Sequence, residues 1–444
     1  MKTNDNKRYL ITYTDGKIGS AAASSILGLT KGKMKDGVKF MATDAVPGKE
    51  DVMHFENVGV TSIQLTEEEA KTLSGKKGIL AVEEDLEMHA LVMPEDQVFQ
   101  SGGEFAPQAN EAANYSDGYN KAVLDVMNYL LKSEKPESNT QGLIPPQIII
   151  PRLFQPIPWN ITRVNAPLAW SRGINGKGVN VAVLDTGIAA HPDLVISGGV
   201  SFVSGVASYN DGHGHGTHCA GVIGARNNFI GVVGVAPLSN LYAVKVLADT
   251  GSGLSSWIIA GMEWCITHGI KVISMSLGAV TGPSVAYATA VKHCQDSGIT
   301  VVMASGNSYG SSFPYVNQPA NSFTHGSAYP NNERPIAVGA IDNLNVIASF
   351  SSRGGATPDW NQVTVVAPGV NIYSTYKGGG YATMSGTSMA TPHVAGCAAL
   401  VCQRYPGITP VNVKSRIAST AIPLGGGHNV TYGYGLINCN AATL

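Results

Sequence analysis

Three short segments of the sequence carry the residue types needed for nucleophilic catalysis by serine. Asp185 ends a strand-like run, and His218 lies in a glycine-rich run, 213–221, where a small-residue helix is predicted to begin. Ser388 lies at the predicted start of another helix, which has a proline in its first turns. A serine hydroxyl attacks efficiently only when a base accepts its proton, and a carboxylate fixes the tautomer of that base. The three segments therefore predict a catalytic triad of Asp185, His218 and Ser388.

A site for a developing oxyanion is predicted beside Ser388. The N-terminus of a helix carries a partial positive charge and free backbone N–H groups, both of which stabilise an oxyanion. Asn307, which follows a Ser-Gly turn just past a predicted strand, is a candidate for the second donor. Each of these residues also has an ordinary structural interpretation, as a cap or a turn residue. The prediction depends on their occurring together.

The elements after Trp159 alternate buried strands with helical segments. The strands are predicted at 179–184, 241–247, 271–275, 300–304, 335–338 and 363–367. This alternation predicts an α/β fold with a doubly wound, mostly parallel sheet. In that architecture reactive groups gather outside the carboxyl ends of the strands, and Asp185 and Asn307 both follow such an end.

The first 91 residues predict a separate, small α+β unit. Strand-like runs at 9–13, 58–65 and 79–83 accompany a capping box at Thr66 and Glu69, which should start a helix. From 92 to 153 the composition shifts to Pro, Gln, Asn, Ser and Glu, with one amphipathic stretch at 121–132, so a linker with one helix is predicted. We therefore divide the chain into 1–91, 92–153 and 154–444.

Composition and charge exclude several classes of partner. The chain has 444 residues, so more than one folding unit is expected, and its formal net charge of −2 gives no basic field for nucleic acid or anionic lipid. The apolar runs are too short to cross a membrane, and the first residues do not form a signal peptide as they stand. The six cysteines lack the paired spacings of a zinc site, but their even number permits up to three disulfides.

In this order and with these flanks, residues 155–444 resemble the subtilisin-like serine proteases, or subtilases. The resemblance implies that Asp185 orients the base, His218 is the general base and acid, and Ser388 is the nucleophile, with Asn307 as oxyanion donor. It also implies a cleft for an extended peptide, whose main chain would add to strand edges and so allow broad specificity. The residues implied for this cleft and its pocket, which we expect to favour apolar or aromatic side chains, are Gly251, Ser252, Gly253, Ser276, Leu277, Gly278, Ala304, Ser305 and Gly306.

The run 225–237 resembles the strong calcium loop of this family. Calcium prefers six to eight hard oxygen ligands, many of them backbone carbonyls. The resemblance implies side-chain ligands from Gln155, Asp193 and Asn228 and carbonyl ligands from Arg226, Ile230 and Val232. A loop without metal is the alternative. Cys219 is similar to the thiol at this place in the proteinase K branch, and we expect it to be packed and unreactive because nothing nearby indicates a lowered pKa.

Residues 7–91 resemble the subtilisin pro-domain, which implies a ferredoxin-like unit that assists folding and then inhibits its own enzyme. The expected protein is a secreted, monomeric endopeptidase precursor that acts on protein and peptide substrates and processes itself, either after Leu91 or nearer Phe154. A latent peptide-binding scaffold, blocked by the 92–153 segment, is the alternative, and the complete set of catalytic residues argues against it. An esterase of the α/β-hydrolase type is disfavoured by the order of the triad and by the absence of a Gly-x-Ser-x-Gly elbow.

Overall fold

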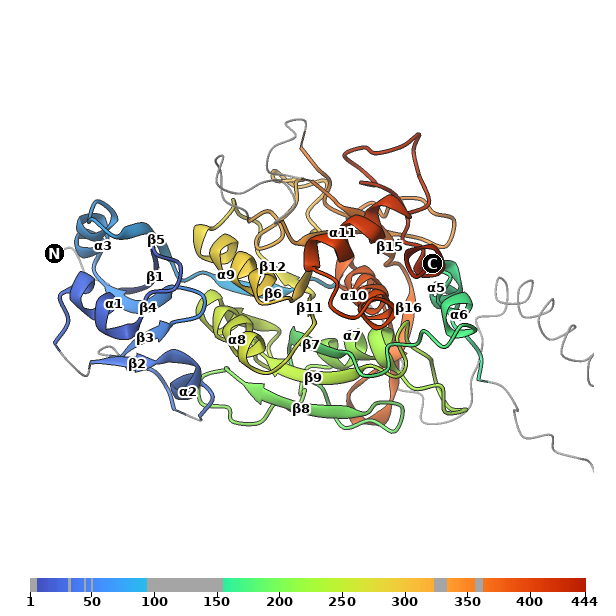
Figure 1. Cartoon of the computed structure of the whole chain (residues 1–444), viewed down its shortest axis with the longest axis horizontal. Coiled ribbons are helices and arrows are strands. Elements are labelled where there is room, and N and C mark those ends of the chain that lie inside the picture. The colour runs from blue at the N-terminus through green and yellow to red at the C-terminus, as the bar shows by residue number, and fades with distance from the viewer. Residues whose placement is uncertain are drawn as a thin grey trace, which may run out of the picture.

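The computed structural model of the chain (Figure 1) describes residues 6–30, 33–43, 45–48, 51–93, 155–322, 334–355 and 362–444. The predicted linker helix at 121–132 and the alternative processing position near Phe154 lie outside the described residues.

A seven-stranded sheet forms the centre of the larger part of the molecule. In sheet order its strands are β15 (Val365–Pro368), β14 (Ile336–Ile341), β13 (Thr300–Ala304), β11 (Val272–Met275), β7 (Asn180–Asp185), β9 (Asn240–Lys245) and β8 (Ile196–Ser201). All neighbouring strands pair in parallel, which confirms the predicted mostly parallel α/β sheet. The sequence predicted every strand except β8, where two adjacent glycines weaken the strand signal.

Helices cover both faces of this sheet (Figure 1). α7 (His215–Gly224) and α10 (Thr387–Arg404) pack on one face, and α8 (Ser255–Thr267) and α9 (Val285–Asp296) pack on the other. Shorter elements are α5 (Trp159–Arg163), α6 (Ala166–Trp170), α11 (Pro410–Ser419), α12 (Cys439–Ala442), the hairpin of β16 (Ile372–Thr375) and β17 (Tyr381–Met384), and the 3-10 turn η2 (Lys377–Gly379) between them. In the described part of the chain, no helix combines the length and apolar character needed to cross a membrane.

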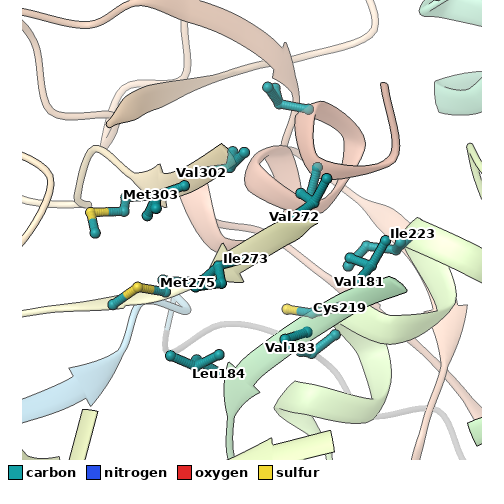
Figure 2. Packing of buried hydrophobic residues seen from close by; sticks show 14 of the residues in the cluster. Val181, Val183, Leu184, Cys219, Ile223, Val272, Ile273, Met275, Val302 and Met303 are labelled. Carbon is teal, nitrogen blue, oxygen red and sulfur yellow. The ribbon is translucent and has the colours of Figure 1, made fainter. Parts of the chain in front are cut away.

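Strand β7 illustrates why these strands have nearly continuous apolar sequences. Figure 2 shows Val181 and Val183 near Ile223 and Cys219 of α7, while Leu184 points to the other side of the sheet. On that side a Cβ atom on Gly261 of α8 would lie 3.3 Å from Leu184 Cδ2, so the helix lies close to the strand. Because both faces of the sheet are buried, the residues that point to either face are apolar, as in other parallel sheets. The strand that delivers Asp185 is therefore held rigidly.

Residues 7–84 form a second sheet with the strand order β2-β3-β4-β1-β5. Its elements are β1 (Lys7–Tyr13), α1 (Ser20–Leu27), β2 (Met34–Asp36), α2 (Gly37–Met41), β3 (Val52–Phe55), β4 (Val60–Leu65), α3 (Glu67–Ser74) and β5 (Ile79–Glu84). The predicted capping box is present, since Thr66 N donates to Glu69 Oε2 at 2.8 Å and Glu69 N donates to Thr66 Oγ1 at 3.2 Å.

One face of this front sheet packs on its own helices, and the other packs on α8 and α9. In β1, Tyr9, Ile11 and Tyr13 belong to the core of the front unit, whereas Leu10 belongs to the larger core shared with the parallel sheet. The two sets belong to different cores because successive side chains of a strand point to opposite faces of the sheet. The front unit is thus seated on α8 and α9 (Figure 1).

Candidate active site

Two of the predicted catalytic residues meet at the carboxyl edge of the parallel sheet. β7 ends at Asp185, and α10 begins one residue before Ser388. Ser388 Oγ donates to the carbonyl of Ser276, directly after β11, at 2.9 Å, and Ser276 Oγ donates to the carbonyl of Ser388 at 2.8 Å. These reciprocal bonds fix the start of α10 against the end of β11. Both Asp185 and Ser388 are 0% exposed.

The imidazole beside Asp185 belongs to His215, and the prediction of His218 was wrong. His215 Nδ1 lies 2.7 Å from Asp185 Oδ1. His218 lies one turn further along α7, where its Nε2 donates to the carbonyl oxygens of Ile372 at 2.9 Å and Ala382 at 3.2 Å. The error arose because α7 begins at His215 rather than at His218. Burial lowers the pKa of His218 to about 3, so this side chain is a neutral, structural donor to the β16–β17 hairpin.

A buried carboxylate that the sequence pattern did not single out holds the segments around Asp185 and His215 together. Asp211 Oδ1 accepts from Thr186 Oγ1 at 2.8 Å, from His213 N at 2.9 Å and from Gly214 N at 2.7 Å. Its Oδ2 accepts from Thr217 N at 2.9 Å and from Thr217 Oγ1 at 2.6 Å. Thr186 follows Asp185, and Thr217 lies in the first turn of α7, which begins with His215. The available signal was an aspartate placed two and three residues before backbone N–H groups, as in an Asx turn.

Asn307 lies where the sequence predicted an oxyanion donor. Its Oδ1 accepts from Thr387 N at 2.9 Å and from Thr387 Oγ1 at 2.8 Å, so the amide is fixed at the start of α10. Its Nδ2 donates to the carbonyl oxygen of Leu91 at 2.9 Å. A Cβ atom on Gly386 would lie only 2.5 Å from that same oxygen, which explains the glycine at this position. The carbonyl of Leu91 thus lies between Asn307 and the N-terminus of α10.

The segment that carries Leu91 crosses the site as an extended strand. β6 (Glu87–Ala90) is the middle strand of a three-stranded antiparallel sheet, between β10 (Ser252–Leu254) and β12 (Leu277–Gly278). Ala90 N donates to the Gly251 carbonyl at 2.9 Å, and Leu91 N donates to the Ser276 carbonyl at 3.3 Å. Past the site, Met93 N donates to the Ser385 carbonyl at 3.0 Å. The chain therefore continues through the site, with the Leu91–Val92 peptide bond against Gly386, two residues before Ser388.

The predicted cleft segments differ in how they meet this strand. Residues 251–253 and 276–278 provide its main-chain partners. Residues 304–306 lie at the end of β13, directly before Asn307. A Cβ atom on Gly278 would lie 3.0 Å from Leu91 Cδ1, so an apolar side chain contacts the floor of the cleft. Met88, three residues earlier, is 0% exposed and belongs to the large core shared with the parallel sheet.

Acidic residues of the front unit cap the two helices beside this cleft. The Glu83 carboxylate accepts from Val285 N at 3.0 Å and Ala286 N at 2.8 Å at the start of α9. The Asp85 carboxylate accepts from Ser256 N at 2.8 Å at the start of α8. Negative charge at a helix N-terminus is favourable. Burial nevertheless raises the pKa of Asp85 to about 6, and one of its oxygens has no hydrogen-bond partner among the described residues.

The predicted calcium ligands also lie together in the structure. Gln155 Nε2 donates to the carbonyl oxygens of Ile230, at 2.5 Å, and Val232, and Gln155 Oε1 accepts from Asn228 N at 2.7 Å. Asp193 Oδ2 accepts from Val232 N at 2.9 Å, whereas its buried Oδ1 has no hydrogen-bond partner in the described part of the chain. The Arg226 side chain points away, to the carbonyl of Pro237, so only its carbonyl is a candidate ligand. Two carbonyls and one buried, unpaired carboxylate oxygen form a donor set that fits a hard cation.

Cys219 lies within the catalytic region but is packed. Its Sγ lies close to Asp185 and His215, with the three candidate ligand atoms within 4.8 Å of one another. It also contacts the carbonyl of Ser388 at 3.5 Å. Burial raises the pKa of the Cys219 thiol well above its usual range, so a thiolate is disfavoured.

Comparison with known proteins agrees with this geometry. Residues 176–435 match the model of the subtilase family. The chain is 50% identical over 289 residues to subtilisin Savinase of Lederbergia lenta, which covers 65% of this chain and 99% of that protein. It is 42% identical over 375 residues to subtilisin E of Bacillus subtilis (strain 168), which covers 84% of this chain and 91% of that protein. An alkaline protease of Shouchella clausii is 49% identical over 291 residues, or 66% of this chain and 71% of that protein. The chain therefore belongs to the subtilase family and is a serine endopeptidase of the subtilisin type.

Proposed function

We propose that the protein hydrolyses peptide bonds with Asp185, His215 and Ser388 as its triad and Asn307 as an oxyanion donor. The observation that carries the proposal is the carbonyl oxygen of Leu91, held 2.9 Å from Asn307 Nδ2 while the strand before it pairs on both sides. A peptide bond held in this way has the pose of a substrate. Because β10 and β12 bind main-chain atoms, which all peptides share, the enzyme accepts a broad range of unfolded chains.

The chemistry follows from the positions of these groups. Asp185 accepts the Nδ1–H of His215, which fixes the tautomer whose Nε2 can take a proton. Ser388 Oγ gives its proton to that nitrogen as it bonds to the carbonyl carbon, and the resulting oxyanion is held by Asn307 and the N-terminal N–H groups of α10. The C–N bond then breaks, and the amine leaves with the proton from His215. Water, deprotonated by His215, hydrolyses the acyl-enzyme and restores Ser388.

We infer further that residues 1–91 are an inhibitory pro-domain and that the enzyme cuts its own chain between Leu91 and Val92. The order β3-β4-β1-β5, with antiparallel neighbours and helices α1 and α3, supports a ferredoxin-like fold for this unit. Capping by Glu83 and Asp85 favours a tight hold on α8 and α9, so the cut tail would remain in the cleft as a product-like inhibitor. Activation then requires destruction of the pro-domain.

We also propose that Gln155, Asp193, Arg226, Asn228, Ile230 and Val232 hold Ca²⁺. The convergent carbonyls and the unpaired Asp193 Oδ1 support this assignment. When bound, the ion would balance the negative charge on these oxygens and would link Gln155 to the loop 225–237. It would take no part in peptide hydrolysis. By analogy with the resemblance described above, we propose secretion and a monomeric state.

Intact mass and casein hydrolysis test these proposals together. The wild-type chain should lose 91 residues, giving a new N-terminus at Val92, and then digest casein. Ser388→Ala and His215→Ala should stay whole and inactive, because loss of either residue of this pair costs about a million-fold in a subtilisin. His218→Gln is the matched control, since it keeps a hydrogen-bond donor in the same helix and should retain processing. Loss of processing in His218→Gln but not in His215→Ala would overturn our assignment of the base. An inert wild type, even after removal of the front unit, would instead favour the latent scaffold.

A further inference from the structure

Two segments of one uncut chain are bound at the same time: residues 87–93 lie in the cleft, and Gln155 lies in the calcium loop. Leu91 and Met93 are bound in the cleft, as their hydrogen bonds to Asn307 and Ser385 show. Further along the same chain, Gln155 is seated in the loop that follows α7. Both attachments involve described residues, and neither requires a free chain end.

The length of the intervening sequence makes this double attachment possible. About 60 residues separate Met93 from Gln155, and an extended chain spans roughly 3.3 Å per residue, so the connection can reach on the order of 200 Å. A domain the size of the catalytic part has a radius of gyration of only about 19 Å. A connection of only a few residues would restrict whether both attachments could form together. Here they are independent.

Gln155 is closely bound within the loop. Its side chain is buried, at 7% exposed, and its Nε2 donates to two of the three backbone carbonyls of the candidate ligand set, those of Ile230 and Val232. Its Oε1 also accepts from Phe229 N at 3.2 Å, in addition to Asn228 N. Phe229 has a positive φ of 69°, a conformation that a non-glycine residue adopts only when its surroundings hold it. The loop is therefore already folded around Gln155 while Leu91–Val92 is intact.

We propose that this calcium site assembles and binds Ca²⁺ in the uncut precursor, so that metal binding precedes cleavage and does not depend on it. This inference rests on the calcium site proposed above. Its consequence is an ordered sequence in which Ca²⁺ stabilises the catalytic part first and cleavage follows on a scaffold that already holds the metal. A ligand that binds the folded state adds stability in proportion to RT ln(1 + [L]/Kd), whatever the state of the Leu91–Val92 bond.

The test uses the full-length Ser388→Ala chain, which cannot cut itself. Its thermal unfolding and its heat of binding are measured with Ca²⁺ alone, before and after nicking at Leu91–Val92 by a trace of the wild-type enzyme. At a hundredfold excess over Kd, the uncut chain should gain on the order of 5 °C in Tm. Gln155→Ala in the same background should lose most of this gain, whereas Gln64→Ala, a glutamine on β4 of the front unit, should keep it.

In a shortened chain, we expect the Ca²⁺ response to depend on nicking. Deletion of residues 97–152 in the Ser388→Ala background leaves a connection that spans roughly 20 Å when extended, about the radius of gyration of the catalytic part. We expect this connection to prevent both attachments at once, so the Ca²⁺ response should be lost while uncut and regained on nicking. If the full-length uncut chain gives no Gln155-dependent response but the nicked chain does, our inference is overturned and the calcium proposal stands. If neither form responds, the calcium proposal itself fails. A deletion variant that responds equally before and after nicking would overturn the role of chain length.

Discussion

Asp211 provides a sharp test of how this active site is held together. Its carboxylate accepts five hydrogen bonds at 2.6–2.9 Å, from Thr186, His213, Gly214 and Thr217. In Asp211→Asn only one oxygen remains. Whichever way the amide turns, at least one buried backbone N–H then faces an NH₂ group.

The expected magnitude follows from these contacts. A buried N–H without an acceptor costs about 1–3 kcal/mol, and each bond that changes from charge-assisted to neutral loses about 1 kcal/mol. Two or three such bonds remain, so we expect the free energy of unfolding to fall by about 4 kcal/mol. Because the same bonds link Thr186 to the first turn of α7, the distance between Asp185 and His215 should also become less well defined. A misplacement of about 1 Å can reduce kcat about 100-fold.

Two measurements check this expectation. Denaturant unfolding in the Ser388→Ala background avoids self-digestion, and kcat and KM for a peptide substrate are measured in the active background. We expect kcat to fall about 10- to 100-fold with KM nearly unchanged. Asp296→Asn, which removes an exposed carboxylate paired with Lys292, is the control and should change stability by less than about 1 kcal/mol. A stability change below that level in Asp211→Asn, with unchanged kcat, would refute the role we assign to Asp211.

Three further predictions concern the other parts of the site. Asn307→Ala should reduce kcat about 100- to 1000-fold with little change in KM, the range found for loss of one oxyanion donor in a subtilisin, and an equal change in KM would indicate a role in substrate binding instead. His218 has its pKa lowered to about 3 by burial, so it contributes stability above pH 6.5 that is lost as the pH falls toward 3. In the Ser388→Ala background, His218→Gln should therefore reduce the loss of stability between pH 7 and 4 by about 3 kcal/mol, and parallel curves for the two chains would contradict this. Glu83→Ala should weaken inhibition of the mature enzyme by its added pro-domain about 10-fold, since it removes a helix cap, whereas Glu84→Ala, an exposed neighbour paired with Lys7, should leave the inhibition constant unchanged.

Much of the fold could be predicted because the signals were local. Buried parallel strands are apolar on both faces, so β7, β9, β11, β13, β14 and β15 were visible as short apolar runs. The capping box at Thr66 needs only residues three apart. β8 was missed because its glycines give no such signal, and β6 was missed because its partners, β10 and β12, come from distant parts of the chain.

The residue types of the active site were determined by the sequence alone, since an aspartate after a buried strand, a histidine in a glycine-rich turn and a serine at a helix start are local features. The sequence did not distinguish the two histidines, because His215 and His218 share the same helix and nearly the same neighbours. Only the tertiary structure decided between them: it places Asp185 against the first residue of α7 and the β16–β17 hairpin against the fourth. It also revealed that Asp211 joins the two segments and that Leu91 and Gln155 are bound in one uncut chain. These relations depend on contacts between residues far apart in sequence, and such contacts form only when the sheet and its covering helices have packed.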